Sequence, residues 1–318
     1  MGHLDHAAFG WLTPALSYAM ACAGAALGLR CTVRALDSSG SARRNWLLTG
    51  ASAIGTGIWT MHFIAMLGFT VVGTDIRYDV PLTLFSLAVA VLVVGTGAFA
   101  VGHGHGRPVE APRSAGPPAA GTADRATARS RRDHRMSLAV GGLTTGLGVA
   151  GMHYLGMAAL RLHGAVHYDP LLVALSLAIA VVAATAALWA ALNIRTPAAV
   201  TVASLVMGAA VSSMHYTGMA AVTVEVSPSA EPLPGATAMQ FIFPLAVGLG
   251  AFLFITSAFV ALSPTADPHA ARGPSHRYAG PDPAPGPPPP GTTGPPPGTT
   301  GPPPRERRPR ERHPLSQP

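Results

Sequence analysis

Three copies of one Met-His...Met pattern contain the residues of this sequence that are best suited to chemistry. In each copy, one methionine directly precedes a histidine and a second methionine follows that histidine by four positions. The nine residues are Met61, His62, Met66, Met152, His153, Met157, Met214, His215 and Met219. Residues four apart lie about 40° apart around an α-helix, so each histidine shares a helix face with the second methionine. Imidazole and thioether together suit copper, because thioethers favour Cu(I) and imidazole accepts either oxidation state.

Other interpretations of the pattern stay open at this point. Zinc is less suitable, because methionine is a poor zinc ligand and the only cysteines are Cys22 and Cys31. A haem held by histidine and methionine is a chemical alternative. In a purely structural alternative, the methionines pack and hydrogen bonds satisfy the imidazoles. We favour a metal or cofactor site, because the pattern occurs three times and ionisable residues inside apolar helices are functional candidates by default.

Apolar stretches long enough to cross a membrane surround these residues. Of the 318 residues, 49% are hydrophobic and only 11% are charged, whereas ordinary soluble domains are roughly one-quarter charged. A bilayer core about 30 Å thick requires about 20 apolar residues per helix. Seven stretches qualify, at residues 12–29, 47–71, 81–101, 138–160, 171–192, 198–224 and 241–262. The sequence therefore predicts an all-α membrane protein of seven transmembrane helices in the lipid bilayer. Asp79 and Asp169 are expected to cap the third and fifth helices.

The distribution of arginine predicts how these helices are oriented. All 21 basic residues are arginine, a usage that indicates a GC-rich bacterial genome and hence a multi-pass protein of the bacterial plasma membrane. Connections expected on one side hold nearly all of the arginines, and the other side holds only Arg77 and Arg161. By the positive-inside rule, the N-terminus lies outside and the C-terminus is cytoplasmic. No nucleic-acid partner is expected, because the arginines lie between apolar spans and not beside base-reading groups.

Two cytoplasmic segments are predicted to be disordered. Residues 103–135 form a loop rich in Gly, Pro, Ala and Arg, and residues 263–318 form a Pro-, Gly- and Arg-rich tail that repeats the run Gly-Thr-Thr-Gly-Pro-Pro-Pro. Neither segment has the apolar residues needed to bury a core, and the composition of the tail favours polyproline II. The expected organisation is a seven-helix membrane domain over residues 1–262, followed by this tail.

The Met-His...Met pattern belongs to a repeated pair of helices. Glycine lies seven residues before each histidine, at Gly55, Gly146 and Gly208. The helices after the first two copies share a Tyr-Asp start, at Tyr78 and Tyr168, whereas the helix after the third copy has diverged. Each histidine lies 18 to 20 residues beyond the last cytoplasmic arginine, and hence roughly 27 to 30 Å along its helix. The three clusters therefore share one level near the outer surface, where they form either one common site or two.

The sequence from residue 9 to residue 262 resembles a known family in these motifs. The tetrapeptide Met-His-Tyr-Thr is intact at 214–217, and related copies begin at Met61 and Met152. On this pattern the chain is similar to the bacterial MHYT-domain integral membrane sensors. The resemblance implies a membrane sensory domain that binds copper through the motif methionines and histidines and detects oxygen, carbon monoxide or nitric oxide. Members of the family often carry cyclic-di-GMP enzymes, histidine kinases or DNA-binding output domains.

A membrane sensor is the function that we expect. It would bind copper near the outer face, detect a diatomic gas and pass a change in helix packing to a separate cytoplasmic signalling partner. A metal transporter is the first alternative, although transport sites tend to lie near the midplane of the membrane. A haem-binding redox protein is the second, although two stacked haems would need histidines at two depths. We expect no enzyme, because the 56 residues after Leu262 are of low complexity and include no catalytic domain.

Overall fold

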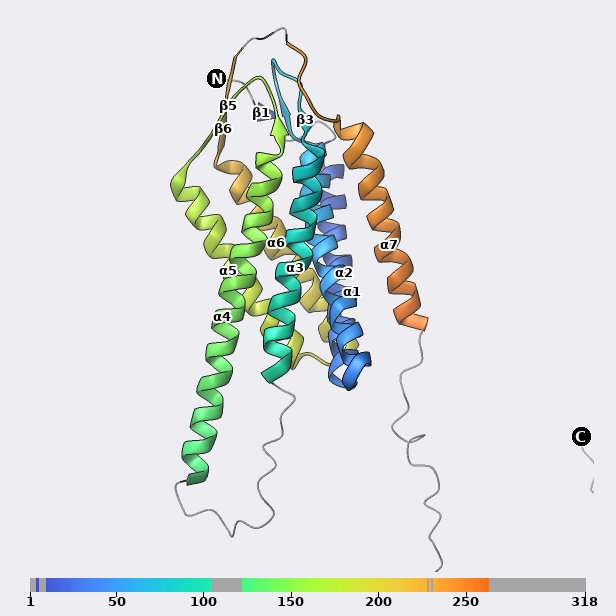
Figure 1. Cartoon of the computed structure of the whole chain (residues 1–318), viewed down its shortest axis with the longest axis vertical. Helices are drawn as coiled ribbons and strands as arrows, with labels where there is room; N and C mark the ends of the chain where they lie inside the picture. Colours follow the sequence, from blue (N-terminus) through green and yellow to red (C-terminus); the bar gives the residue numbers. More distant parts are fainter. Residues whose placement is uncertain (1–3, 6–9, 105–121, 228, 230, 263–318) are drawn as a thin grey trace, which may run out of the picture. The chain divides into compact units, whose positions relative to one another are not determined.

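Seven long α-helices make up most of the described part of the chain (Figure 1). The computed structural model describes residues 4–5, 10–104, 122–227, 229 and 231–262. The helices are α1 (Leu12–Leu36), α2 (Gly40–Leu67), α3 (Val80–Gly104), α4 (Thr122–Ala158), α5 (Pro170–Asn193), α6 (Pro197–Ala220) and α7 (Phe243–Leu262), the last preceded by a π-helical turn, η1 (Ala238–Ile242). Each of the seven apolar stretches lies largely in one of these helices, in the expected order. The tail at 263–318 and residues 105–121 of the loop lie outside the described residues.

Length and composition identify a multi-pass membrane protein. Within the described residues, six helices are long and apolar enough to cross a membrane, namely α1, α2, α3, α5, α6 and α7 together with η1. α4 does not meet the same measure, and its apolar half is rich in glycine. It nevertheless packs between α3 and α5, both of which do. A seventh crossing stays a prediction, as does the orientation of the chain in the membrane.

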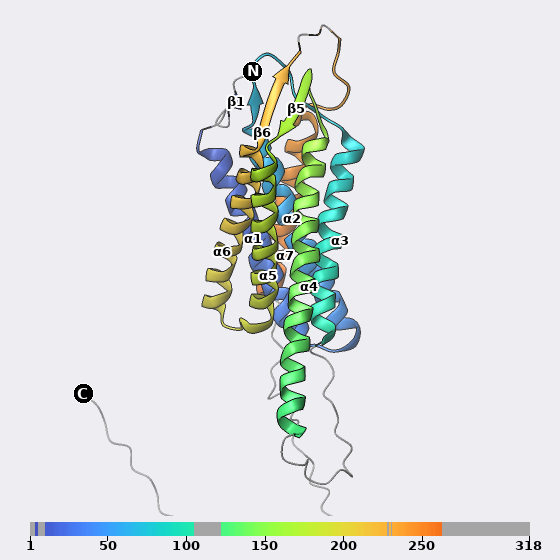
Figure 2. The ribbon, with the colours of Figure 1, turned by 90° about the vertical axis from the view of Figure 1, so that its left-hand side faces the viewer.

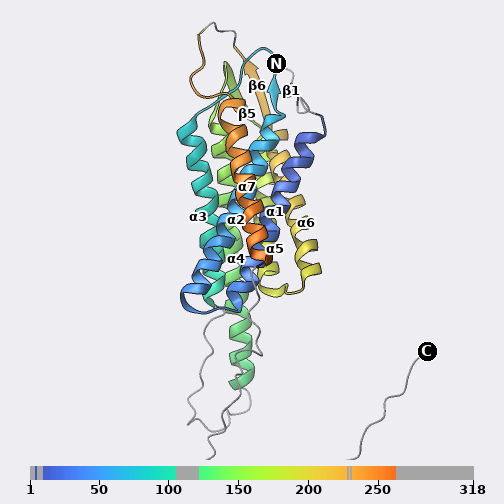
Figure 3. The same cartoon turned by 90° about the vertical axis from the view of Figure 1, so that its right-hand side faces the viewer.

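The first six helices form a closed ring, in which α2, α4 and α6 alternate with α1, α3 and α5. α3 packs between α2 and α4, α5 packs between α4 and α6, and α1 packs between α6 and α2. α7 lies outside this ring, against α1 and α2 (Figure 3). The three helices that carry the Met-His...Met pattern are therefore the alternate members of the ring, and α2 contacts both α4 and α6.

α1 takes the same place beside α6 that α3 takes beside α2 and that α5 takes beside α4. The glycine seven residues before each histidine marks the close approach of each pair. A Cβ on Gly55 would lie 2.7 Å from Val91 Cα of α3, and a Cβ on Gly146 would lie 2.5 Å from Val181 Cα of α5. A Cβ on Gly208 of α6 would overlap Cys22 of α1. The contact of α6 is therefore made with α1 and not with α7.

Buried serines confirm that α1 matches α3 and α5. Each lies five residues before the residue that meets the glycine, is fully buried, and donates a hydrogen bond to the carbonyl oxygen three residues earlier. They are Ser17 of α1, Ser86 of α3 and Ser176 of α5. The sequence suggested that the divergent last helix is the partner of α6. The structure corrects this, because the first helix of the chain fills that place.

Replacing Gly146 by Ala is expected to destabilise the fold. The new methyl group would press on the backbone of α5 at Val181, and overpacking of this kind costs about 1–3 kcal/mol. The Tm of the purified protein should fall by roughly 2 to 10 °C in a thermal melt. Gly151→Ala in the same helix is the control, because a Cβ at Gly151 meets nothing within 4 Å. Equal losses of stability in both variants would contradict the close-packing role.

Short antiparallel strands lie together at one end of the bundle, called here the strand end (Figure 2). The pairs are β1 (Leu4–Asp5) with β2 (Thr70–Val71), β3 (Arg77–Tyr78) with β4 (Leu160–Arg161), and β5 (Gly164–Tyr168) with β6 (Val222–Val226). We expected residues 70–71 and 222–224 to be helical, and that prediction was wrong. The alternation of valine with Thr and Glu in β6 suits a strand with one buried face, and Val222 and Val224 are buried.

The first turns of α4 correct a second prediction. We expected residues 103–135 to be disordered, but α3 continues to Gly104 and α4 begins at Thr122. Alanine and arginine, which are common between Thr122 and Arg135, favour a helix, and the apolar part of α4 supplies formed turns from which it propagates. Figure 2 shows α4 extending past its neighbours at the end away from the strands. The helix that carries His153 therefore continues into an arginine-bearing extension.

Candidate metal centre

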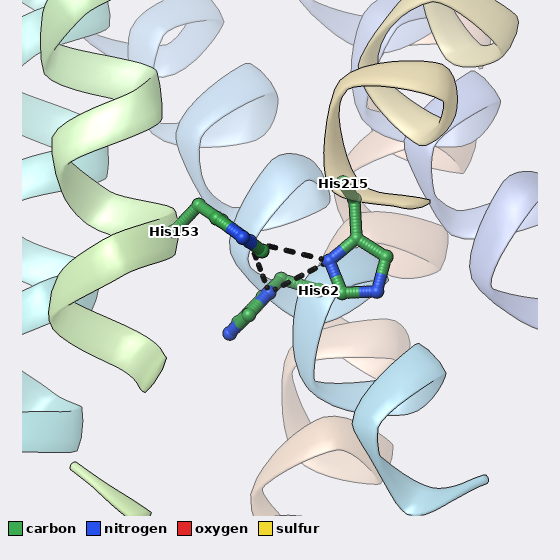
Figure 4. A group of neighbouring side chains, drawn as sticks. All are labelled: His62, His153 and His215. Atoms are coloured by element: carbon green, nitrogen blue, oxygen red, sulfur yellow. Dashed lines mark hydrogen bonds between the residues drawn. The ribbon is translucent and has the colours of Figure 1, made fainter. Parts of the chain in front are cut away.

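Three imidazoles meet inside the bundle (Figure 4). Each lies five residues before the end of its helix, where a strand follows. His62 comes from α2, His153 from α4 and His215 from α6, and their Nδ1 atoms face one another. The Nδ1–Nδ1 distances are 3.0 Å from His62 to His215, 3.2 Å from His62 to His153, and 3.3 Å from His153 to His215. Each residue is at most 1% exposed. The sequence left open whether the three clusters converge or pair, and the structure brings the three imidazoles together.

Hydrogen bonding alone does not satisfy this triangle. A neutral imidazole carries a proton on only one of its two nitrogens, so each Nδ1 is either a donor or an acceptor. Among three such atoms at least two are alike, and one edge of the triangle therefore brings donor to donor or lone pair to lone pair. No Asp, Glu or Cys of the described residues joins the three histidines within 4.8 Å, so a protonated ring would place a positive charge in a cluster that contains no carboxylate.

The same triangle fits a single metal ion. Metal–imidazole bonds are about 2.0 Å long, so three nitrogens on one face of a tetrahedron lie about 3.3 Å apart. The observed edges, 3.0 to 3.3 Å, are close to that spacing. A tetrahedral ion bound by the three Nδ1 atoms would keep a fourth position for another ligand. The three imidazoles can therefore hold one ion, and they are the three histidines that the sequence singled out.

Glycines of neighbouring helices make room for two of the rings. A Cβ on Gly156 of α4 would overlap Nε2 of His62, and a Cβ on Gly218 of α6 would lie 2.5 Å from Nε2 of His153. Neither of these Nε2 atoms has a hydrogen-bond partner in the described part of the chain. The two rings are therefore held by packing against helix backbone. The repeat pattern did not predict a role for these glycines, although each lies three residues after the histidine of its own copy.

The six methionines of the pattern are all buried, but they do not gather at one point. The second methionine of each copy belongs to one apolar cluster with valines of β2 and β6, between the imidazoles and the strands; these are Met66, Met157 and Met219. Met152 and Met214 belong instead to the central core, and Met61 is 1% exposed. The structure thus collects the second methionines in one layer, one helical turn from the histidines. Ligation by any methionine stays a prediction.

The three histidines lie in three separate matches to one family model. The model, MHYT, is described as "Bacterial signalling protein N terminal repeat" and matches residues 55–111, 146–204 and 208–267, together more than half of the chain. The chain belongs to the MHYT family. Each MHYT repeat contributes one imidazole to the centre, and the resemblance seen in the motifs is confirmed.

Curated relatives that share the MHYT region are signalling proteins. The bifunctional diguanylate cyclase/cyclic di-GMP phosphodiesterase MucR of Pseudomonas aeruginosa is 39% identical over 182 residues, 56% of this chain and 22% of MucR. The cyclic di-GMP phosphodiesterase NbdA of the same organism is 34% identical over 225 residues, 69% of this chain and 25% of NbdA. An uncharacterized signaling protein of Caulobacter vibrioides is 31% identical over 206 residues, 65% of this chain and 22% of that protein. The match spans at most about a quarter of each relative. No solved structure matches the chain.

The third position of the MHYT motif packs against the histidine before it. Phe63, Tyr154 and Tyr216 meet the preceding ring edge-on, with centroid distances of 4.6, 4.8 and 5.0 Å. The Tyr154 hydroxyl also forms a hydrogen bond of 2.7 Å with Ser176 of α5. These contacts tie a pattern-bearing helix to its outer partner and limit rotation of the imidazoles.

An ion pair at the strand end joins the loops that follow α2 and α4. Arg161 Nη2 donates to Asp79 Oδ2 at 2.7 Å. Asp79 Oδ1 accepts a hydrogen bond from the backbone N–H of Leu82 at 3.1 Å. Asp169 Oδ1 accepts one from the backbone N–H of Leu171 at 2.8 Å. Both aspartates therefore cap their helices, as predicted. The Arg161 side chain and, after it, the Leu82 N–H hold the pKa of Asp79 below its ordinary value.

Acid is expected to remove the contribution of this ion pair. Because the pKa of Asp79 in the folded protein lies below the value of about 3.9 for a free aspartate, the pair stabilises the fold above that pH, and its contribution disappears as the pH falls through the lowered pKa. The Tm of the wild type should therefore fall more steeply between about pH 5 and pH 3 than the Tm of Asp79→Asn. Asp75→Asn, at an exposed position in the same loop, should keep the wild-type slope. If the Tm of the wild type and the Tm of Asp79→Asn fell in parallel as the pH was lowered, the ion pair would add nothing to the stability of the fold.

Proposed function

We propose that this MHYT domain binds one copper ion near the outer face of the plasma membrane and is the sensing part of a signalling system. The convergence of the Nδ1 atoms of His62, His153 and His215 within 3.3 Å of one another carries this proposal. Membership of a family of signalling proteins supports the sensory role. The strand end is taken to face outward, with the N-terminus outside and the C-terminus cytoplasmic, because the arginines concentrate in connections at the other end.

Charge favours the monovalent ion, Cu(I). Imidazoles are neutral ligands, and no carboxylate or thiol of the described residues joins them. A divalent ion would leave twice the uncompensated charge inside the bundle, and burying unpaired charge is costly. The layer of Met66, Met157 and Met219 offers soft thioethers that suit Cu(I). When bound, Cu(I) would supply a centre with affinity for oxygen, carbon monoxide or nitric oxide at the position that no imidazole fills.

The two alternative functions receive less support from the geometry. The Nδ1 atoms lie 3.0 to 3.3 Å apart, which leaves no room for a porphyrin plane between any two of them. A haem held by one histidine and one methionine stays the form of this alternative that a Soret band would reveal. A transporter needs a polar route away from its site on both sides. The space below the histidines is lined almost entirely by carbon, from Ile58 and Met214 down to Leu36.

Anaerobic titration with Cu(I) tests the proposal. Protein purified in detergent without added metal is titrated in competition with a chromogenic Cu(I) chelator, and its metal content is then measured by mass spectrometry. We expect one copper per chain, retention of copper in excess zinc, and no Soret band. Exposure of the copper form to carbon monoxide should give a carbonyl stretching band in the infrared. Preference for zinc, or a Soret band from the purified protein, would contradict the proposal.

The location of the ligands offers a physical route from the site to the other end of the bundle. Because the three histidines lie on different helices, a shared ion fixes the spacing of α2, α4 and α6. α4 continues to Thr122, and the exposed Arg129 and Arg132 there offer a basic surface to a separate signalling partner. We expect the distance between spin labels on the far ends of α4 and α6 to change when Cu(I) binds. Identical distances with and without copper would count against signal transfer along these helices.

A further inference from the structure

An apolar cavity of about 100 Å³ lies inside the ring, and residues of all six ring helices line it. Three of these lining residues take the same position in the three repeats, four residues before the histidine; they are Ile58, Val149 and Val211. Residues four apart share a helix face and lie about 6 Å apart along the helix axis. The upper end of the cavity is therefore one helical turn from the imidazoles, on the side away from the strands.

A second layer of lining residues repeats this arrangement one turn further from the histidines. These residues lie eight positions before each histidine; they are Ile54, Thr145 and Met207. Alanines of α5, including Ala180 and Ala184, leave space that larger side chains would fill. Because α2, α4 and α6 each contribute to both layers, the cavity follows the same three helices that carry the histidine centre.

The volume and the wall of the cavity favour a small apolar occupant. An apolar cavity of about 150 Å³ stays free of water and takes up xenon or benzene. A space of about 100 Å³ therefore suits a molecule of a few atoms. Thr145 is the one polar residue in the two layers, and its buried hydroxyl has no hydrogen-bond partner in the described part of the chain. One hydroxyl is too little for a buried water, which typically makes about three hydrogen bonds.

We propose that the upper part of the cavity is a docking site for one neutral diatomic gas molecule, from which the gas reaches the copper of the proposed centre. The second step rests on the proposed copper site, whereas docking itself needs no metal. Oxygen, carbon monoxide and nitric oxide carry no charge and bond weakly to water, so transfer into apolar surroundings costs them little. Each would restore dispersion contacts that the lining atoms of an empty cavity lack.

The position of the cavity connects it with the histidine centre. The cluster that contains Met66, Met157 and Met219 lies between the imidazoles and the strands, whereas the cavity approaches the imidazoles from inside the bundle. An occupant at the upper end lies about one helical turn from the histidines and is bounded by all three helices that carry them. Filling this space should therefore slow the access of gas to the copper without removing a ligand.

Xenon binding to the metal-free full chain tests the docking site. Xenon is an apolar probe close in size to a diatomic gas, and NMR of isoleucine methyl groups in lipid nanodiscs reports where it binds. We expect the methyl shifts of Ile54 and Ile58 to saturate as the xenon pressure rises. Ile255, 65% exposed on α7, is the internal control, because xenon dissolved in lipid should shift its methyl in proportion to pressure. A shift of Ile58 that also stays proportional to pressure would overturn the proposal.

Two variants change the cavity in opposite directions. Ala180→Leu fills it with an isobutyl group and should weaken xenon binding by roughly tenfold or more. Ala178→Leu, at an exposed position of the same helix, is the matched control and should bind xenon as the wild type does. Val211→Ala enlarges the upper end and should strengthen xenon binding severalfold, which keeps the test decisive if Ala180→Leu fails to fold. Equal xenon affinities of the wild type and Val211→Ala would overturn the assignment of the site.

Flash photolysis of carbon monoxide from the Cu(I) form tests the passage from the cavity to the metal. In Ala180→Leu, carbon monoxide should bind the copper roughly tenfold more slowly than in the wild type, because its docking site is filled. Ala178→Leu should keep the wild-type rate. Equal rates in the wild type and Ala180→Leu would overturn the passage. Since the xenon measurement uses metal-free protein, saturable xenon binding would support the docking site even if the copper proposal failed.

Discussion

Replacing His153 with alanine is expected to abolish copper binding by the MHYT domain. The variant keeps two of the three imidazoles, and we expect its affinity to fall more than about 100-fold and its copper content to fall below about one tenth per chain. Copper at a thousandfold excess over its Kd should stabilise the wild type by about 4 kcal/mol, a rise in Tm of roughly 10 °C. Thermal melts with and without Cu(I) should show this rise in the wild type and none in His153→Ala.

His167→Ala is the matched control, because His167 lies on β5 with its side chain 58% exposed. It should bind copper as the wild type does. Without metal, His153→Ala leaves His62 and His215, whose Nδ1 atoms at 3.0 Å can share one hydrogen bond. The metal-free variant should therefore lose less stability than copper adds to the wild type. If His153→Ala bound copper fully and its metal-free form were strongly destabilised, the histidines would stabilise the packed core and would not be metal ligands.

Gly156→Ala is expected to weaken copper binding by about 10- to 100-fold without removing any ligand. The added methyl group would occupy the space of His62 Nε2, and the buried ring would have to turn or shift, taking its Nδ1 out of the triangle. Gly218→Ala should act in the same way through His153, where the new Cβ would lie 2.5 Å from Nε2. Competition titration with the Cu(I) chelator measures both affinities.

Gly151→Ala separates this effect from a general response of α4 to an added methyl group. Gly151 lies in the same helix as Gly156, and a Cβ there meets no atom within 4 Å. Its copper affinity should equal that of the wild type. If Gly156→Ala and Gly151→Ala bind copper equally well, the orientation of the His62 ring does not depend on the glycine beneath it.

Local features of the sequence predicted much of this fold. Seven apolar stretches gave seven helices, because the length and composition of a stretch decide whether it can form a membrane helix. Asp79 and Asp169 gave helix caps, because the capping hydrogen bonds reach only two or three residues along the chain. The shared level of the three histidines followed from their similar distances, 18 to 20 residues from the last arginine, along parallel helices.

Features that depend on contacts between distant segments could not be predicted. Whether three histidines form one site or two depends on the order of helices around the ring, and repeat spacing does not contain that order. Gly156 touches a histidine of α2, so its role is invisible within its own copy. The strand at 222–226 was missed because its valines also suit an apolar helix, and only pairing with β5 decides between the two. The turns at Thr122–Arg135 were missed because composition alone resembled a flexible loop.

Because α1 lies beside α6, the three repeats do not by themselves supply all six helices of the ring. The family match begins at residue 55, yet the third repeat takes its outer partner from residues 12–36. A rearranged chain that runs from α2 to β6 and then continues into α1, without α7, would place three complete helix pairs in sequence order. α7, the one long helix of the described part that lies outside the ring, belongs to none of these pairs. We therefore expect the smallest unit that can be transplanted with an intact histidine centre to include α1, from Leu12 onward.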